Sequence, residues 1–115
     1  MKGFVAVAVL AAATVAPSGA AVRLPAGTYP LATDSGGVVR TAWLHIPPIP
    51  EPEAGYPLVL VFHGTLGTGR NIEAKTGFDA VADEAGFLVA YPNAFGIQWR
   101  DGRDDSAGNP PADDV

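Results

Sequence analysis

The feature that most constrains this chain is an unbroken apolar run that ends in His-Gly. Residues Leu58–Phe62 are all apolar, and His63 and Gly64 follow directly. A run without polar alternation predicts a strand covered on both faces, as at the centre of a parallel sheet. The loop 63–70 contains three glycines and leads into helical sequence. The stretch therefore predicts a strand, a tight loop and a helix in that order.

The sequence after this loop predicts one helix and a second buried strand. We expect the helix to begin near Asn71 and to contain a capping box at Thr76–Asp79. Its expected apolar stripe consists of Phe78, Val81, Ala82 and Ala85, with Asp79, Asp83 and Glu84 facing away. Gly86 is a natural stop, and Phe87–Ala90 is the second strand. A strand–helix–strand unit of this length predicts a parallel pair.

The first half of the chain predicts an antiparallel hairpin. A short strand at Thr28–Ala32 precedes turn residues at Asp34–Gly37, and a strand rich in β-formers follows at Val38–Ile46. The segment Pro47–Pro57 has five prolines in eleven residues, which excludes a helix and predicts a stiff loop. The predicted fold class is therefore α/β, with a hairpin followed by a parallel unit.

The amino terminus predicts export. Lys2 supplies a charged start, Phe4–Val15 is apolar, and small residues follow at Pro17–Ala20. We expect residues 1–20 to form a signal peptide cleaved after Ala20, because the apolar stretch is too short to span a membrane. Residues 21–115 then form the domain, and the mature protein is expected to be secreted.

Charge and cysteine content exclude several classes of protein. The net charge is −5, with seven basic and twelve acidic residues and no basic cluster, so a nucleic-acid partner is not expected. Cysteine is absent. Because small exported domains usually depend on disulfides, either another device stabilises this chain or it is part of something larger.

The chain resembles the exported α/β-hydrolases that include polyhydroxybutyrate depolymerases and feruloyl esterases. The matching segments are Pro57–Gly64, Thr76–Ala94, Trp99 and Pro111–Val115, together with Trp43–Pro47 at the end of the hairpin. The resemblance implies the amino-terminal portion of an α/β-hydrolase fold. It also implies hydrolysis of a carboxylic ester by a serine, without a cofactor.

In such a family the loop after the His-Gly strand supplies a backbone N–H to the oxyanion hole. The resemblance assigns this role to Thr65, with Leu66 next, and makes Gly64 and Gly67 supports that let the backbone approach the substrate. No G-x-S-x-G elbow occurs among the 115 residues. None of the serines is a credible nucleophile: Ser18, Ser35 and Ser106. The resemblance places nucleophile, acid and base after Val115.

Two histidines and one tryptophan need separate interpretation. His63 is interpreted as an anchor of the loop rather than as a catalytic base, and His45 as a structural histidine within a strand. Two interpretations stay open for Trp99, which either lines a substrate pocket or caps the core.

The acidic segment 101–114 is interpreted as a solvated loop rather than a calcium site, because the alternating ligand spacing is missing. The final residues 113–115 are expected to open a helix.

Two classes of function remain open. The first is the front half of a secreted serine esterase, acting on a polyester or on feruloyl or acetyl esters of plant polysaccharide. The second is a catalytically inactive truncated product or an exported binding module, favoured by the missing triad. No metal or membrane span is expected in either case, and the oligomeric state stays open.

Overall fold

The computed structural model of the chain describes residues 23–100 and residue 114. The predicted signal peptide and most of the acidic segment therefore lie outside the described residues. The elements, in chain order, are β1 (Gly27–Ser35), β2 (Val38–Ile46), β3 (Leu58–Leu60), α1 (Gly69–Thr76), α2 (Phe78–Ala85) and β4 (Leu88–Pro92). Helices and a mixed sheet confirm the α/β class.

The four described strands form one sheet in the order β1-β2-β4-β3. The pairing of β1 with β2 is antiparallel and extends from Gly27–Ile46 to Ser35–Val38, which confirms the hairpin. Gly36 and Gly37, with φ of 64° and 82°, form the turn. β1 is longer than expected because the pairing continues up to this turn.

The βαβ unit has the expected strand direction. β3 pairs parallel with β4, in the register Leu58–Leu88 to Leu60–Ala90, and β4 pairs antiparallel with β2. β4 thereby joins the hairpin to the parallel unit, and its central position explains why Val89 and Tyr91 are fully buried.

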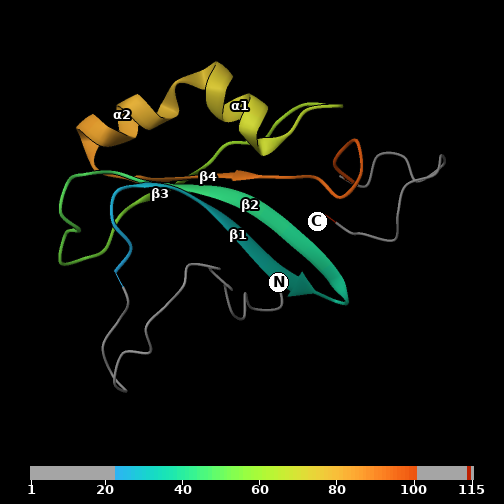
Figure 1. Cartoon of the computed structure of the whole chain (residues 1–115), viewed down its shortest axis with the longest axis horizontal. Coiled ribbons are helices and arrows are strands. Elements are labelled where there is room, and N and C mark those ends of the chain that lie inside the picture. Colours follow the sequence, from blue (N-terminus) through green and yellow to red (C-terminus); the bar gives the residue numbers. More distant parts are fainter. Residues whose placement is uncertain (1–22, 101–113, 115) are drawn as a thin grey trace.

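Both helices cover the same face of the sheet, where they pack on β2 and β4 (Figure 1). The core lies between these layers and is centred on Ala82, Val89 and Tyr91. Partly buried side chains surround it: Trp43, Val61, Ile72, Phe78 and Phe87. No helix in the described part of the chain is long and apolar enough to cross a membrane.

The prediction that the run Leu58–Phe62 is covered on both faces is wrong for the described residues. β3 is at the edge of the sheet, and alternate side chains stay open: Leu58 is 56% exposed, Leu60 53% and Phe62 55%. Val61 packs toward the helices. Because side chains alternate along a strand, helices on one face cover only every second residue.

The single predicted helix is in fact two. Gly77 adopts a left-handed conformation with φ of 65°, ends α1 and precedes α2 without a side-chain cap, so the expected capping box does not form. The side-chain cap is at Thr68 instead, where the hydroxyl accepts a hydrogen bond from the Asn71 N–H at 3.1 Å.

The orientation of α2 also differs from the prediction. Val81, expected in the apolar stripe, is 52% exposed, whereas Ala82 is fully buried. Asp79 and Asp83, expected to face solvent, instead bind Tyr91 and His45 of the sheet. The expected stop at Gly86 is confirmed, since this residue is left-handed with φ of 79° and its N–H donates to the Ala82 carbonyl.

Candidate functional site

The loops that follow β3 and β4 are joined by three hydrogen bonds. The Leu66 N–H donates to the Ile97 carbonyl at 2.7 Å, and the Ala94 N–H donates to His63 Nε2 at 3.1 Å. The Trp99 indole N–H donates to the His63 carbonyl at 2.8 Å. The two loops therefore form one unit at the carboxyl ends of the parallel strands, where such sheets usually bind ligands.

His63 is the residue at which most of these bonds meet. The side chain is buried, and its Nδ1 lies 2.7 Å from the Gly64 carbonyl oxygen. Because Nε2 accepts from the Ala94 N–H, the ring hydrogen must be on Nδ1, from which it is donated to Gly64. Neither ring nitrogen is free to take a proton from a nucleophile. This geometry fits an anchor of the loop rather than a catalytic base.

The two predicted oxyanion donors differ in the structure. The Leu66 N–H donates to the Ile97 carbonyl, so Leu66, the candidate named next after Thr65, has no free N–H in this conformation. Leu66 also has a φ of 64°, the one positive value of a non-glycine residue among the described residues. The bond to Ile97 holds this unfavourable backbone in place.

Thr65 remains the candidate donor. The residue is exposed, and its N–H makes no hydrogen bond to any group in the described part of the chain. It lies between Gly64 and Leu66, both of which are fixed by hydrogen bonds of the loop. A backbone N–H without a partner, on a fixed loop at a strand's carboxyl end, has the character of an oxyanion-hole donor.

The two supporting glycines have different roles. A Cβ on Gly67 would lie 2.9 Å from the His63 Cβ and 3.0 Å from the Gly64 carbonyl oxygen, so glycine lets the loop pack on its own anchor. A Cβ on Gly64 would meet nothing within 4 Å. Only Gly64 therefore has open space beside it for a substrate to approach.

Trp99 lies against the loop anchor. Its ring centroid is 4.9 Å from that of His63, and it meets the Phe62 ring edge-on at 5.1 Å. With the indole N–H bonded to the His63 carbonyl, the side chain covers the loop. Trp99 does not line the hollow described below.

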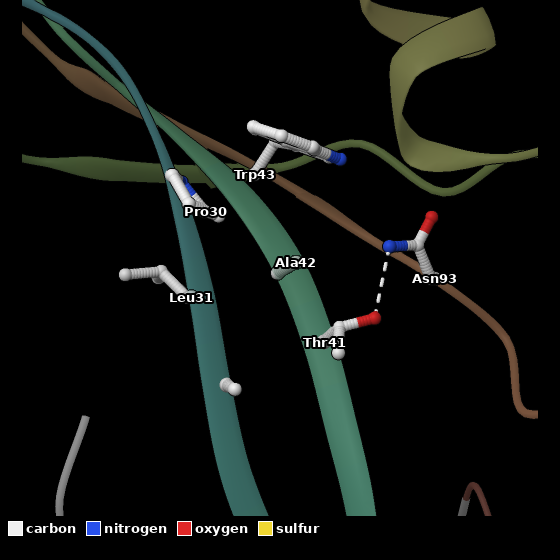
Figure 2. Close-up of a pocket in the computed structure, with 7 residues that line it drawn as sticks. Pro30, Leu31, Thr41, Ala42, Trp43 and Asn93 are labelled. Atoms are coloured by element: carbon white, nitrogen blue, oxygen red, sulfur yellow. Dashed lines mark hydrogen bonds between the residues drawn. The ribbon is translucent and has the colours of Figure 1, made fainter. Parts of the chain in front are cut away.

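Asn93 is a residue that the sequence analysis missed. Its Oδ1 accepts from the Gly69 N–H at 2.7 Å, and its Nδ2 donates to the Thr41 hydroxyl at 3.0 Å (Figure 2). Asn93 thereby fixes the first residue of α1 to β2. Its place directly after β4 was the available signal, because polar residues at strand ends often serve the site.

An apolar hollow of about 400 Å³ lies over the hairpin next to Asn93 (Figure 2). Its lining is formed by Pro30, Leu31, Ala32, Thr41, Ala42, Trp43 and Asn93. The Arg70 guanidinium carbon lies 3.9 Å from the Trp43 ring centroid, a cation–π contact that fixes this wall. The lining suits a hydrocarbon group rather than a charged one.

No group of acidic or histidine side chains among the described residues could hold a metal ion. Most of the segment 101–114 lies outside the described residues. Asp114 is described, and its carboxylate accepts from the Arg40 guanidinium and from the Arg100 N–H, both at 2.6 Å. Protein donors thus occupy both oxygens of this carboxylate. The expected helix at 113–115 lies outside the described residues apart from Asp114, which is in neither a helix nor a strand.

Comparison with known proteins gives one informative similarity. The chain is 38% identical over 64 residues to the putative esterase NocK of Nocardia uniformis subsp. tsuyamanensis. The chain resembles part of an esterase. The match spans 55% of this chain but only 19% of that protein, so it extends over about a fifth of the relative's length. No protein-family model matches the chain, and no solved structure matches it.

Proposed function

We propose that this chain is the amino-terminal part of a secreted serine esterase and that it contributes a backbone donor to the oxyanion hole. The similarity to an esterase supports the general class of reaction. The more specific assignment, to enzymes like polyhydroxybutyrate depolymerases and feruloyl esterases, rests on the sequence segments described above.

The observation that most supports this proposal is the state of the Thr65 amide. Ester hydrolysis by a serine passes through a tetrahedral oxyanion, which fixed N–H donors stabilise. Thr65 is an exposed residue whose N–H has no partner among the described residues, on a loop fixed by His63 and Ile97. Removing one such donor typically lowers kcat by about 10²- to 10³-fold.

The nucleophile, acid and base of this proposal are contributed by sequence after Val115. The 115 residues contain no G-x-S-x-G, and His63 has both ring nitrogens engaged. Export follows from the predicted signal peptide at residues 1–20. The substrate is an ester of a hydroxyalkanoate polyester or of plant-wall polysaccharide, and the reaction needs no cofactor.

The second candidate function is a catalytically inactive product or an exported binding module. The missing elbow favours it, since no serine of the chain follows that pattern. The apolar hollow next to Asn93 is the surface that a binding module would offer.

Two measurements separate these functions. We expect a G-x-S-x-G elbow in the source reading frame within some tens of codons after Val115, and p-nitrophenyl butyrate hydrolysis by the protein that includes it. We expect no turnover from residues 21–115 alone. Turnover by these residues above a serine-free control would contradict the assignment of the nucleophile, and a frame without an elbow would favour the binding module.

A further inference from the structure

A cluster of polar side chains lies between the helices and the sheet, away from the candidate oxyanion loop. His45 of β2 is its centre and is only 8% exposed. Thr28 of β1, Glu73 of α1 and Asp83 of α2 reach it from three other elements. The cluster therefore connects the hairpin with both helices.

The hydrogen bonds of this cluster determine where its hydrogens are. His45 Nε2 lies 2.7 Å from Asp83 Oδ1, and the Asp83 side chain is 42% exposed, so its ionised carboxylate accepts from an Nε2–H. The Thr28 hydroxyl donates its one hydrogen to Glu73 Oε1 at 3.2 Å. The same oxygen lies 3.0 Å from His45 Nδ1 and can only accept there. Both ring nitrogens must then donate.

The surrounding charges support this arrangement. Glu73 Oε2 accepts from the Arg70 guanidinium at 2.9 Å. Burial alone would raise the pKa of the Glu73 carboxyl, but hydrogen bonding with Arg70, Asp79 and Thr28, together with the Arg70 charge, outweighs burial and lowers it. An ionised Glu73 has no hydrogen to give to Thr28, which excludes the arrangement in which Thr28 donates to the ring.

Asp79 faces the same ring from α2. Its Oδ2 lies 3.5 Å from His45 Nδ1, and its Oδ1 accepts from the Tyr91 hydroxyl at 2.6 Å. Burial and the neighbouring Glu73 carboxyl raise the pKa of Asp79, while the Tyr91 hydrogen bond opposes them. The side chains that contact His45 are therefore Thr28, Asp79 and Asp83, none of which is a cation. The nearby Arg70 is bound to Glu73.

We propose that His45 is held as an imidazolium by Thr28 and Asp83 and acts as a pH-sensitive latch that holds the helices on the sheet. Loss of one ring proton as pH rises would remove a donor from one of its two bonds. The Asp83 bond joins α2 to the sheet, and the Thr28 hydroxyl joins the sheet to α1 through Glu73. A bare Nε2 no longer donates to Asp83, and a bare Nδ1 draws the Thr28 hydrogen away from Glu73, so either loss loosens a contact between a helix and the sheet. The latch is independent of ester hydrolysis.

Nitrogen NMR of the whole ¹⁵N-histidine-labelled chain tests the proposal, because the chain has only two histidines. The chemical shifts distinguish an imidazolium from each neutral tautomer, in solution or, if the chain associates, in the solid state. At about pH 7 we expect one ring with both nitrogens protonated, assigned to His45 by its loss in His45→Gln. His63 should be neutral with its hydrogen on Nδ1, and this tautomer signal also serves as a control that the fold is formed. A neutral His45 beside such a His63 would overturn the proposal.

A matched pair of variants tests the role of Asp83. Asp83→Asn and Glu84→Gln each remove one negative charge from α2, but Asp83 is bonded to the His45 ring, whereas Glu84 is exposed. We expect Asp83→Asn to lower the ratio of imidazolium to neutral His45 seen by NMR about tenfold at a fixed pH, because the ring loses the negative charge that its Nε2–H faces. Glu84→Gln should change it by less than about threefold. Equal changes in the two variants would overturn the latch. If a variant does not fold, the NMR spectrum of the unmodified chain at about pH 7 decides the protonation state of His45.

Discussion

The approach of α1 to β4 at Gly69 yields a quantitative prediction. A Cβ at this position would lie 2.4 Å from the Tyr91 carbonyl oxygen and 3.2 Å from Asn93 Oδ1. Ordinary van der Waals contact begins at 3.4 Å, so Gly69→Ala must move the helix or the strand by about 1 Å. The blocking atom belongs to the backbone of a fully buried residue and cannot rotate away.

The expected cost of Gly69→Ala combines two effects. Overpacking of a well-packed core costs about 1–3 kcal/mol. The hydrogen bond from the Gly69 N–H to Asn93, 2.7 Å long, is also lengthened, at about 1 kcal/mol. The higher helix propensity of alanine returns up to about 1 kcal/mol. We therefore expect the free energy of unfolding to fall by about 2 kcal/mol.

Urea unfolding measured by tryptophan fluorescence and far-ultraviolet circular dichroism checks this value. Gly64→Ala is the matched control, because a Cβ there meets nothing within 4 Å and its φ is not positive. The control should stay within about 0.5 kcal/mol of the parent chain. If both variants unfold at the same urea concentration, the result contradicts the close approach of α1 to β4 at Gly69.

Three further predictions concern other contacts. Trp99→Phe keeps an aromatic ring but removes the N–H that donates to the His63 carbonyl. It should lower the free energy of unfolding in urea by about 1 kcal/mol. An unchanged midpoint of the urea transition would contradict this hydrogen bond. The exposed apolar side chains of the edge strand β3 predict that the chain self-associates. Leu60→Lys places a charge there and should reduce this association in sedimentation velocity, whereas equal association would exclude this edge as the contact. Burial, the hydrogen bond to Asp79 and nearby negative charge raise the pKa of Tyr91 above its ordinary value of 10.0. The stability that this gives is fully present below pH 10 and is lost as the pH rises further. The thermal unfolding temperature should therefore fall less steeply above pH 10 in Tyr91→Phe than in the parent chain. Parallel plots of unfolding temperature against pH would argue against the raised pKa.

The elements defined by local chemistry were predictable from the sequence. The turn at Asp34–Gly37 fixed the hairpin, because its two glycines permit the positive φ values that the turn needs. The apolar strands on either side of a helix predicted the parallel pair. These features depend on neighbouring residues alone, so no knowledge of distant contacts was needed.

The failures arose where distant contacts decide the outcome. The left-handed backbone of Gly77 divides the expected helix in two. The pattern of apolar residues gave no sign of this break. Asp79 and Asp83 turned toward the sheet because Tyr91 and His45 offer buried partners there. Likewise, the partner of the Leu66 amide is Ile97, 31 residues away, and nothing near Leu66 in the sequence indicates it.

Two substitutions at Thr65 test the central claim most directly. Thr65→Pro removes the backbone N–H, whereas Thr65→Ala keeps it and removes only the side chain. In the protein translated from the whole reading frame, we expect Thr65→Pro to lower kcat for p-nitrophenyl butyrate by about 10²- to 10³-fold, with circular dichroism unchanged. Thr65→Ala should stay within a few-fold of the parent. Equal kcat values for the two variants would contradict an oxyanion donor at this amide.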